Sequence, residues 1–300
     1  MKTFKAHDGC SIRYATYTSS LKSCRGTVLL LGGRSEFIEK YQETVDEILA
    51  RGFNVATFDW RGQGLSDRLL PNRHKGFVET YDDYLSDLNQ FMDAYVRPDA
   101  ARPLVILAHS MGAHIALRYL HDNPGSVEKA VLTSPLVDIT GPLLFKGLMK
   151  ILTQFAVAIG FKKHYATRTM NFVPQKKAFS GNRLTRDPQR FQKTLQMISH
   201  TPDVAIGGVT FGWLDATFKS IAHVMRKGYL ESITTPICII SAGADKIVSV
   251  TAQRGLCRRL PSCYLVTIPD ALHELMVETD DVREKIWEVF DNFLLSTATS

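Results

Sequence analysis

Short runs of apolar residues alternate along the chain with longer stretches in which apolar residues recur at helical spacing. Six of these runs are apolar almost throughout and are expected to be buried strands: 27–31, 54–58, 104–108, 130–133, 236–241 and 264–268. Helices are predicted between and after them, at 41–51, 81–96, 111–123, 250–259 and 281–295. Continuously apolar strands that alternate with helices are typical of a parallel sheet covered on both faces. We therefore predict an α/β fold, preceded by a hairpin of strands 2–6 and 11–17 around the turn dipeptide Asp8-Gly9.

Residues 141–223 interrupt this alternation. They are helix-prone and basic, and they contain no run that is convincing as a buried strand. Within them, residues 142–161 are rich in Leu, Phe, Met and Ile. An insertion of this size between two strands is expected to cover the carboxyl edge of the sheet, where open α/β sheets bind ligands. We predict a core of residues 1–140 and 224–300 and a helical cap of residues 141–223.

The sequence AHSMGA at 108–113 lies where a predicted strand meets a predicted helix. A serine on a sharp strand–turn–helix bend, with small residues near it, is typical of a nucleophile elbow. The small residues are needed because the strained turn brings the backbones of strand and helix together. Ala108 replaces the first glycine of the usual G-x-S-x-G pattern, and alanine is still small enough to fit. Ser110 is therefore the candidate nucleophile.

A serine hydroxyl needs a base to take its proton, and His273 is the candidate among nine histidines. It lies in the loop after the last predicted strand, at the same sheet edge as Ser110. An acid must fix the tautomer of this base and stabilise its charged form. Asp245, after the penultimate strand, completes the chain order Ser…Asp…His and is the first choice. Asp138, just past the strand that ends at residue 133, is the alternative.

The tetrahedral intermediate of an acyl transfer also needs hydrogen-bond donors for its oxyanion. The backbone N–H of Met111, directly after the nucleophile, is one candidate donor. The second is expected from the turn GGRS at 32–35, and we assign it to the backbone N–H of Arg34. A phosphate-binding loop is excluded there, because no GxxxxGK[ST] sequence follows the glycines.

Over nearly its whole length the chain resembles α/β-hydrolases of the lysophospholipase and monoacylglycerol lipase branch. The motifs that carry the resemblance are Gly33-Arg34 with Tyr41 downstream, DWRGQGLS at 59–66, HSMG at 109–112, Asp245 and His273-Glu274. In that superfamily the DxRGxGxS stretch is structural, which implies that Asp59, Arg61 and Ser66 pin the loop beside the active site. The segment GGVTFGW at 207–213 also resembles that branch, and its aromatic residues are expected either to line an acyl tunnel or to pack within the cap.

The resemblance implies the α/β-hydrolase fold and a serine carboxylester hydrolase that acts on single-chain lipids, either lysophospholipids or monoacylglycerols, through an acyl-enzyme intermediate. In such an enzyme Ser110 attacks the ester carbonyl, His273 transfers the proton and Asp245 orients His273. No metal or organic cofactor is implied. Two alternatives stay open. One is a proline iminopeptidase-like aminopeptidase, which needs carboxylates near the site for the amino group of its substrate. The other is a hydrolase fold kept only as a non-catalytic binding module.

Composition adds expectations about the surroundings of the protein. The 300 residues are 45% hydrophobic and 22% charged, which is typical of a globular chain with a sizeable core. No apolar stretch reaches the ~18 residues of a membrane span. Five cysteines without CxxC spacing predict reduced thiols and a cytoplasmic address, and argue against a disulfide framework or a zinc site.

The formal charge of +6 is concentrated between residues 141 and 200, which carry eleven basic residues and the single acid Asp187. The basic residues are Lys146, Lys150, Lys162, Lys163, Arg168, Lys176, Lys177, Arg183, Arg186, Arg190 and Lys193. Combined with the long apolar run, this charge predicts peripheral contact of the cap with anionic lipid at the inner face of the membrane. A solvated basic face without a partner is the alternative. Nucleic acid is not expected, because no DNA- or RNA-binding motif accompanies the charge.

Overall fold

Eight strands form one sheet in the computed structural model, which describes residues 2–166, 170–174 and 177–296. The strands are β1 (Lys2–Lys5), β2 (Ser11–Tyr17), β3 (Gly26–Leu31), β4 (Phe53–Phe58), β5 (Leu104–His109), β6 (Lys129–Thr133), β7 (Ile237–Ala242) and β8 (Cys263–Ile268). Their order is β1-β2-β4-β3-β5-β6-β7-β8, and all neighbours from β4 to β8 pair in parallel, whereas β1 and β2 are antiparallel additions at one edge. The predicted α/β fold is confirmed, and each predicted strand ends within one residue of the observed one.

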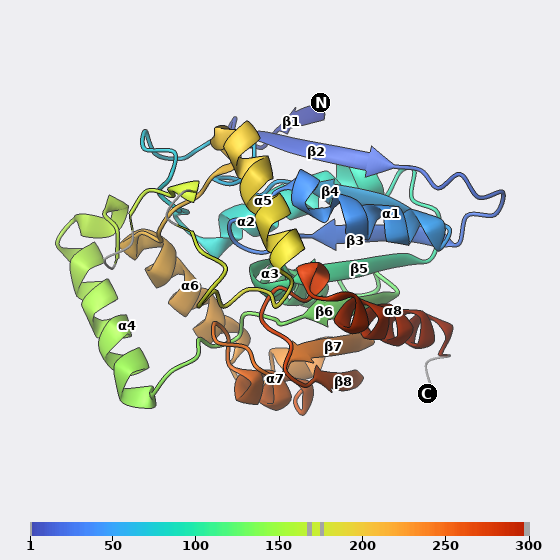
Figure 1. Cartoon of the computed structure of the whole chain (residues 1–300). Coiled ribbons are helices and arrows are strands. Elements are labelled where there is room, and N and C mark those ends of the chain that lie inside the picture. The colour runs from blue at the N-terminus through green and yellow to red at the C-terminus, as the bar shows by residue number, and fades with distance from the viewer. Residues whose placement is uncertain (1, 167–169, 175–176, 297–300) are drawn as a thin grey trace.

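Helices cover both faces of this sheet (Figure 1). The five helices that do so are α1 (Gln42–Ala50), α2 (Tyr81–Phe91), α3 (Ser110–Asp122), α7 (Val250–Cys257) and α8 (Asp280–Leu295). Val28 and Leu30 of β3 belong to the apolar cluster formed with α1 and α8, whereas Leu29 and Leu31 belong to the cluster formed with α2, α3 and α7. Because successive side chains of a strand point to opposite faces, a strand covered on both sides is apolar at every position.

Between β6 and β7 the chain leaves the sheet and forms α4 (Leu143–Ala158), α5 (Pro188–His200) and α6 (Phe211–Val224). α6 contacts α2 and α3, and α4 packs on α6, so that α4 lies at the periphery of the molecule (Figure 1). None of the helices in the described part of the chain is long and apolar enough to cross a membrane. The division into a core and a cap of residues 141–223 stays a prediction, and two of the basic residues assigned to the cap, Arg168 and Lys176, lie outside the described residues.

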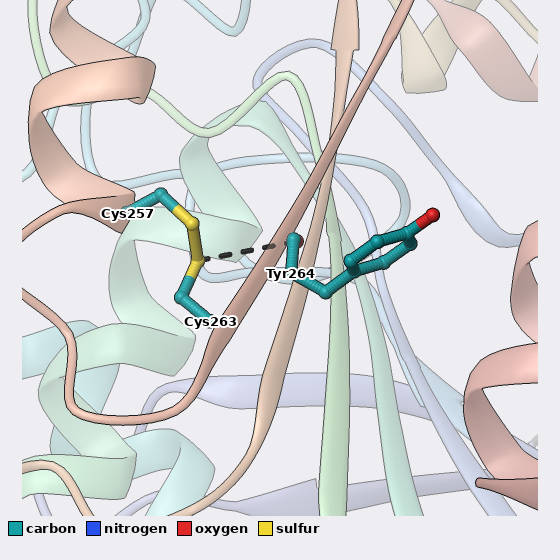
Figure 2. The surroundings of a disulfide bond; sticks show 3 residues. All are labelled: Cys257, Cys263 and Tyr264. Carbon is teal, nitrogen blue, oxygen red and sulfur yellow. Dashed lines mark hydrogen bonds between the residues drawn. A yellow bond between two sulfur atoms is a disulfide. The ribbon is translucent and has the colours of Figure 1, made fainter.

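A disulfide joins Cys257, the last residue of α7, to Cys263, the first residue of β8 (Figure 2). The expectation of reduced thiols is therefore wrong for these two cysteines, while Cys10, Cys24 and Cys238 are free. The short connection from α7 to β8 brings the two Cα atoms within 5.4 Å of each other. This proximity is a result of the tertiary structure, and no cysteine spacing motif in the sequence indicates it. Because disulfides persist in oxidising surroundings, the cysteines no longer support the predicted cytoplasmic address.

Gly112, in the first turn of α3, lets this helix approach the end of β3. A Cβ atom there would lie 2.4 Å from the carbonyl oxygen of Gly32 and 2.7 Å from that of Leu31. We expect Gly112→Ala to lower the free energy of unfolding by about 1–3 kcal/mol, the usual cost of overpacking. Urea denaturation measures the change.

Gly255→Ala, inside α7, is the matched control. The nearest atom to a Cβ at Gly255 would be Nη2 of Arg258, 3.9 Å away. Alanine is therefore expected to stabilise that helix by about 0.5–1 kcal/mol through its better helix propensity. Equal urea midpoints for the two variants would contradict the close contact of α3 with β3.

Candidate active site

Ser110 lies at the junction of β5 and α3 in a left-handed backbone conformation, with φ at 50°. This conformation is strained for a residue with a side chain. Two contacts hold it: α3 packs on the end of β3 at Gly112, and the backbone N–H of Leu136 donates to the Ser110 carbonyl at 3.1 Å. The turn therefore fixes the Ser110 hydroxyl at the carboxyl edge of the sheet, where it is buried.

Backbone strain gathers along this edge. Among the described residues, four non-glycine residues have φ in the left-handed region: Ser35, Ser110, Ser134 and Asp270. Each follows the carboxyl end of a strand, β3, β5, β6 and β8 respectively. Such residues cost of order 1–3 kcal/mol each and cluster at functional sites. The loops at this edge therefore hold strained backbone conformations, which the rest of the fold must stabilise.

Three of the predicted residues meet at this edge. His273, in the loop after β8, places its Nε2 3.0 Å from the Ser110 Oγ and its Nδ1 2.7 Å from Oδ2 of Asp245. A carboxylate only accepts hydrogen bonds, so we assign the proton of the neutral ring to Nδ1, which donates to Asp245. Nε2 is then free to accept the proton of the Ser110 hydroxyl. In serine hydrolases, a relay of this geometry converts the serine hydroxyl into a nucleophile.

Asp245 is held by the backbone as well as by the histidine. Its Oδ1 accepts hydrogen bonds from the N–H groups of Ile247 at 2.7 Å and Val248 at 3.0 Å. Burial by itself raises the pKa of Asp245, but the hydrogen bond and charge of His273 and these two N–H groups outweigh it, and the pKa is lowered. Asp138, the alternative acid, instead forms an ion pair with Lys146 of α4.

The turn after β3 lies directly beside the nucleophile. A Cβ atom built on Gly33 would be 3.2 Å from the Ser110 Cβ. The backbone N–H of Arg34 has no hydrogen-bond partner in the described part of the chain. Met111 belongs to the first turn of α3, where backbone N–H groups lack intrahelical acceptors. Both N–H groups are thus available near Ser110, and their assignment as oxyanion donors stays a prediction.

The DWRGQGLS motif buttresses this region, as the resemblance implies. Oδ1 of Asp59 accepts from the N–H of Ile38 at 2.9 Å, and the Ser66 hydroxyl donates to the Asp59 carbonyl at 2.6 Å. Arg61 makes a buried ion pair with Asp87 of α2 at 2.6 Å. The motif thereby joins the segment after β4 to α2 and to the 3₁₀ turn η1 (Ile38–Tyr41) that follows the candidate oxyanion turn.

Two further side chains of the motif hold the candidate oxyanion turn itself. Nε1 of Trp60 donates to the Gly32 carbonyl at 2.8 Å. Oε1 of Gln63 accepts from the N–H of Ser35 at 2.5 Å. The turn is thus fixed at both of its ends by side chains that come from the loop after β4.

Sequence reasoning missed a buried ionic cluster below the site. The Glu36 carboxylate accepts from the Gly33 N–H, from the Tyr41 hydroxyl and, at 3.0 Å, from Lys40, whose Nζ also lies 2.7 Å from Oε1 of Glu274. Burial raises the pKa of Glu36, but the charge of Lys40 and the hydrogen bonds from Tyr41 and Gly33 together outweigh it, and the pKa falls to about 2. The signal available in the sequence was a Glu–Lys pair four residues apart, next to Tyr41.

The side chain of Arg34 was also not anticipated, because only its backbone was considered. Its guanidinium donates to the Gly207 carbonyl at 2.6 Å and lies 5.3 Å from the ring centroid of Trp213. Burial lowers the pKa of Arg34 to about 10. A narrow cavity lies here, lined by Arg34, Gly62, Gln63, Gly76, Phe77, Tyr84, Ile206 and Trp213. Trp213 of the 207–213 segment therefore lines a cavity beside the candidate oxyanion turn.

The arrangement is suited to nucleophilic acyl transfer by a serine. It combines a candidate nucleophile, a candidate base within hydrogen-bond reach of it, a candidate acid bonded to that base, and N–H groups near Ser110. Within residues 2–166, 170–174 and 177–296, no three His, Cys, Asp or Glu side chains are grouped as a metal site.

Comparisons with known proteins point in the same direction. Residues 22–280 match the family Hydrolase_4, described as serine aminopeptidase, S33. The chain is 30% identical over 263 residues to lysophospholipase L2 of Escherichia coli K12, covering 85% of this chain and 76% of that protein. It is 29% identical over 275 residues to the probable lysophospholipase L2 of Haemophilus influenzae, covering 90% of this chain and 84% of that protein. A soluble variant of monoglyceride lipase from Saccharomyces cerevisiae, solved with a substrate analog, shares the fold: TM-score 0.78, 19% identity, 98% of this chain and 94% of that one.

The contacts of Asp245 and Asp138 predict different effects of removing their charges. Asp245→Asn leaves the shape of the site but removes the acceptor that fixes the His273 tautomer. We expect its rate of reaction with a fluorophosphonate at Ser110 to fall by on the order of 10⁴-fold. Asp138→Asn is the matched control and should react within about twofold of the wild-type rate. The opposite ranking would transfer the role of the acid to Asp138.

Proposed function

Because the chain belongs to the Hydrolase_4 family, serine aminopeptidase S33, we propose that it is a serine carboxylester hydrolase of single-chain lipids. The observation that carries the proposal is the pair of hydrogen bonds from Ser110 to His273 and from His273 to Asp245. The class of substrate is supported by the relatives, which are named lysophospholipase in Escherichia coli and monoglyceride lipase in Saccharomyces cerevisiae. The substrates are lysophospholipids or monoacylglycerols.

The proposed reaction proceeds in two halves. As the Ser110 Oγ bonds to the ester carbonyl carbon, Nε2 of His273 takes its proton, and the carbonyl electrons move to the oxygen, which accepts from the N–H groups of Arg34 and Met111. When the intermediate collapses, the ester C–O bond breaks and the leaving alcohol takes the proton from His273. Water then repeats the sequence on the acyl-serine and releases the fatty acid. Asp245 stays ionised and stabilises the charged imidazole in both halves.

We infer that residues 141–223 act as a cap whose movement admits the substrate. Ser110 and His273 are only 7% and 5% exposed. The cavity beside the candidate oxyanion turn is too small to hold a water molecule. Typical ligand pockets hold about 300–1,000 Å³, so an acyl chain needs space that this arrangement does not provide. Trp213 and Ile206, which line the cavity, belong to the proposed cap, and their displacement would enlarge it toward the candidate oxyanion donors.

We propose that α4 brings the protein to an anionic lipid surface. Its apolar side chains face solvent, with exposed fractions of 81% at Leu143 and 89% at Leu144. The other large apolar residues exposed along it are Phe145, Leu148, Ile151, Leu152 and Phe155. Apolar patches of this kind are rare on monomeric proteins unless they bind a partner or a membrane. Exposed lysines at positions 150 and 163 add the charge that favours an anionic headgroup layer.

The aminopeptidase alternative is less well supported by the site. It requires a free carboxylate to bind the amino group of the substrate. Glu36 and Glu274, two carboxylates that lie beside the candidate catalytic turns, are both paired with Lys40. Comparison of a proline amide with a short acyl ester as substrate tests this alternative directly. A non-catalytic binding module would hydrolyse neither.

Ser110→Ala removes the nucleophile and leaves the rest of the site in place. We expect hydrolysis of a lysophospholipid or a monoacylglycerol to fall by on the order of 10⁶-fold, as in comparable serine hydrolases. Release of fatty acid from a panel of single-chain lipids measures the loss. A pure, folded variant that keeps more than a few per cent of the activity would exclude Ser110 as the nucleophile.

Lipid binding by α4 predicts that hydrolysis of lysolipid is faster in anionic vesicles than in neutral ones, and that salt removes the difference. Replacing both Leu143 and Leu144 by Ser should reduce hydrolysis in vesicles by about tenfold or more, because each leucine contributes about 1.5–3 kcal/mol when buried in an apolar phase. Replacing Lys150 and Lys163 by Glu should abolish the preference for anionic vesicles.

Hydrolysis of a short soluble ester is the internal control for these variants, since it needs the triad but no interface. Leu21→Ser is the matched control for the leucines, because Leu21 is 51% exposed outside the proposed cap. Equal rates on anionic and neutral vesicles at low salt would contradict lipid binding and favour the alternative, in which the basic residues of 141–200 form a solvated face without a partner.

A further inference from the structure

Three charged side chains are buried beneath the two turns that frame Ser110. Lys40 stands between Glu36 and Glu274, with its Nζ 3.0 Å from Oε1 of Glu36 and 2.7 Å from Oε1 of Glu274. The side chains of Glu36, Lys40 and Glu274 are only 3%, 4% and 12% exposed. We call these three residues the ionic bridge.

Each end of the ionic bridge holds one of the turns. Glu36 accepts the backbone N–H of Gly33, the residue before the candidate oxyanion donor Arg34. Glu274 directly follows His273, the candidate base, in the chain. The bridge thus joins the turn after β3 to the loop after β8. In the sheet these two strands are separated by β5, β6 and β7, so strand pairing alone does not fix the distance between the two turns.

A contribution to the stability of the fold does not explain why such a buried charged cluster is present. Removing charges from water is costly, and replacing a buried ion pair by well-packed apolar residues often leaves a protein as stable or more stable. Breaking the pair on one side is harmful because it leaves a buried charge without a partner. A three-membered bridge does, however, define the relative position of the groups that its members hold, and those groups here are the two turns beside Ser110.

We propose that Lys40 is a positioning residue, which sets the candidate oxyanion turn and the His273 loop at the correct distance through Glu36 and Glu274. The inference rests on the proposed function, since it assigns Lys40 a part in the turnover of the ester. Lys40 does not touch the reacting atoms. Its contribution is to the geometry in which the oxyanion donors and the base act together on one tetrahedral centre, where a shift of about 1 Å costs on the order of 10²-fold in rate.

The charges around Glu36 make this role measurable. In the described part of the chain, the titratable groups that face Glu36 are Lys40 and Tyr41 from η1 and His109 from the end of β5, with Glu274 behind Lys40. Burial lowers the pKa of His109 to about 4, so this ring is neutral near pH 7. Lys40 is then the cation that keeps Glu36 ionised, and without it Glu36 takes up a proton at a higher pH.

Lys40→Met keeps the length of the side chain and removes its charge. With a short soluble ester, we expect kcat to fall by on the order of 10²-fold while KM changes less than about threefold, because the substrate-binding surface is untouched. The acid limb of the kcat profile should move to higher pH as Glu36 titrates. Lys40→Arg, which restores a cation with several donors, should recover most of kcat and the original pH profile.

Lys219→Met is the matched control. Lys219 also pairs with a carboxylate four residues earlier, Asp215 at 2.7 Å, but its side chain is 69% exposed on α6. This variant should keep the kcat and pH profile of the wild type. A folded Lys40→Met enzyme with kcat within threefold of wild type and an unchanged profile would overturn the inference.

Glu274→Gln provides an independent test if Lys40→Met does not fold, because it is nearly isosteric and breaks only one arm of the ionic bridge. We expect a smaller loss of kcat, with KM again little changed, and an unchanged kcat would overturn the inference. The proposed function is tested separately by wild type and Ser110→Ala. Its failure would appear as absent or Ser110-independent ester hydrolysis, whatever the behaviour of the Lys40 variants.

Discussion

The site depends on one close contact, that between the first turn of α3 and the end of β3. Gly112 allows it, since any side chain there would collide with the carbonyls of Gly32 and Leu31. The contact forces Ser110 into its left-handed turn, and it also brings the first N–H groups of α3 next to the turn that contains Arg34. The contact of α3 with β3 therefore positions both Ser110 and the candidate oxyanion donors. The apolar core of the sheet provides the stability that offsets the backbone strain at Ser110.

Buried carboxylates organise the loops around this contact. Asp245 accepts two backbone N–H groups in the loop after β7, Asp59 accepts the N–H of Ile38, and Glu36 accepts that of Gly33. A loop at the edge of a sheet has backbone donors that no neighbouring strand satisfies, and a carboxylate with two oxygens can bind several of them. Arg13 and Lys40 balance the charges of Asp59 and Glu36, and the His273 ring donates a hydrogen bond to Asp245. The carboxyl edge is thus ordered by ionic side chains over an apolar core.

The strands were predictable from the sequence because burial on both faces demands continuous apolar runs. The proximity of Ser110, His273 and Asp245 was predictable because the ends of parallel strands gather at one edge of the sheet. What the sequence did not reveal depends on tertiary proximity. Lys40 and Glu274 meet although most of the chain lies between them, and nothing in either local sequence indicates the other. The Cys257–Cys263 disulfide likewise follows from how the chain returns from α7 to β8.

That disulfide has a mechanical consequence for the edge of the sheet. β8 is the outermost strand and pairs only with β7, and such edge strands fray and expose unpaired N–H and C=O groups to other chains. Cys263 anchors the start of β8 to α7, while the ring of Tyr264 points away from the bond (Figure 2). The far end of the same strand leads to His273. Reduction of the bond would therefore first increase local unfolding and self-association at this edge, and disturb turnover only when the strand that carries the base begins to open.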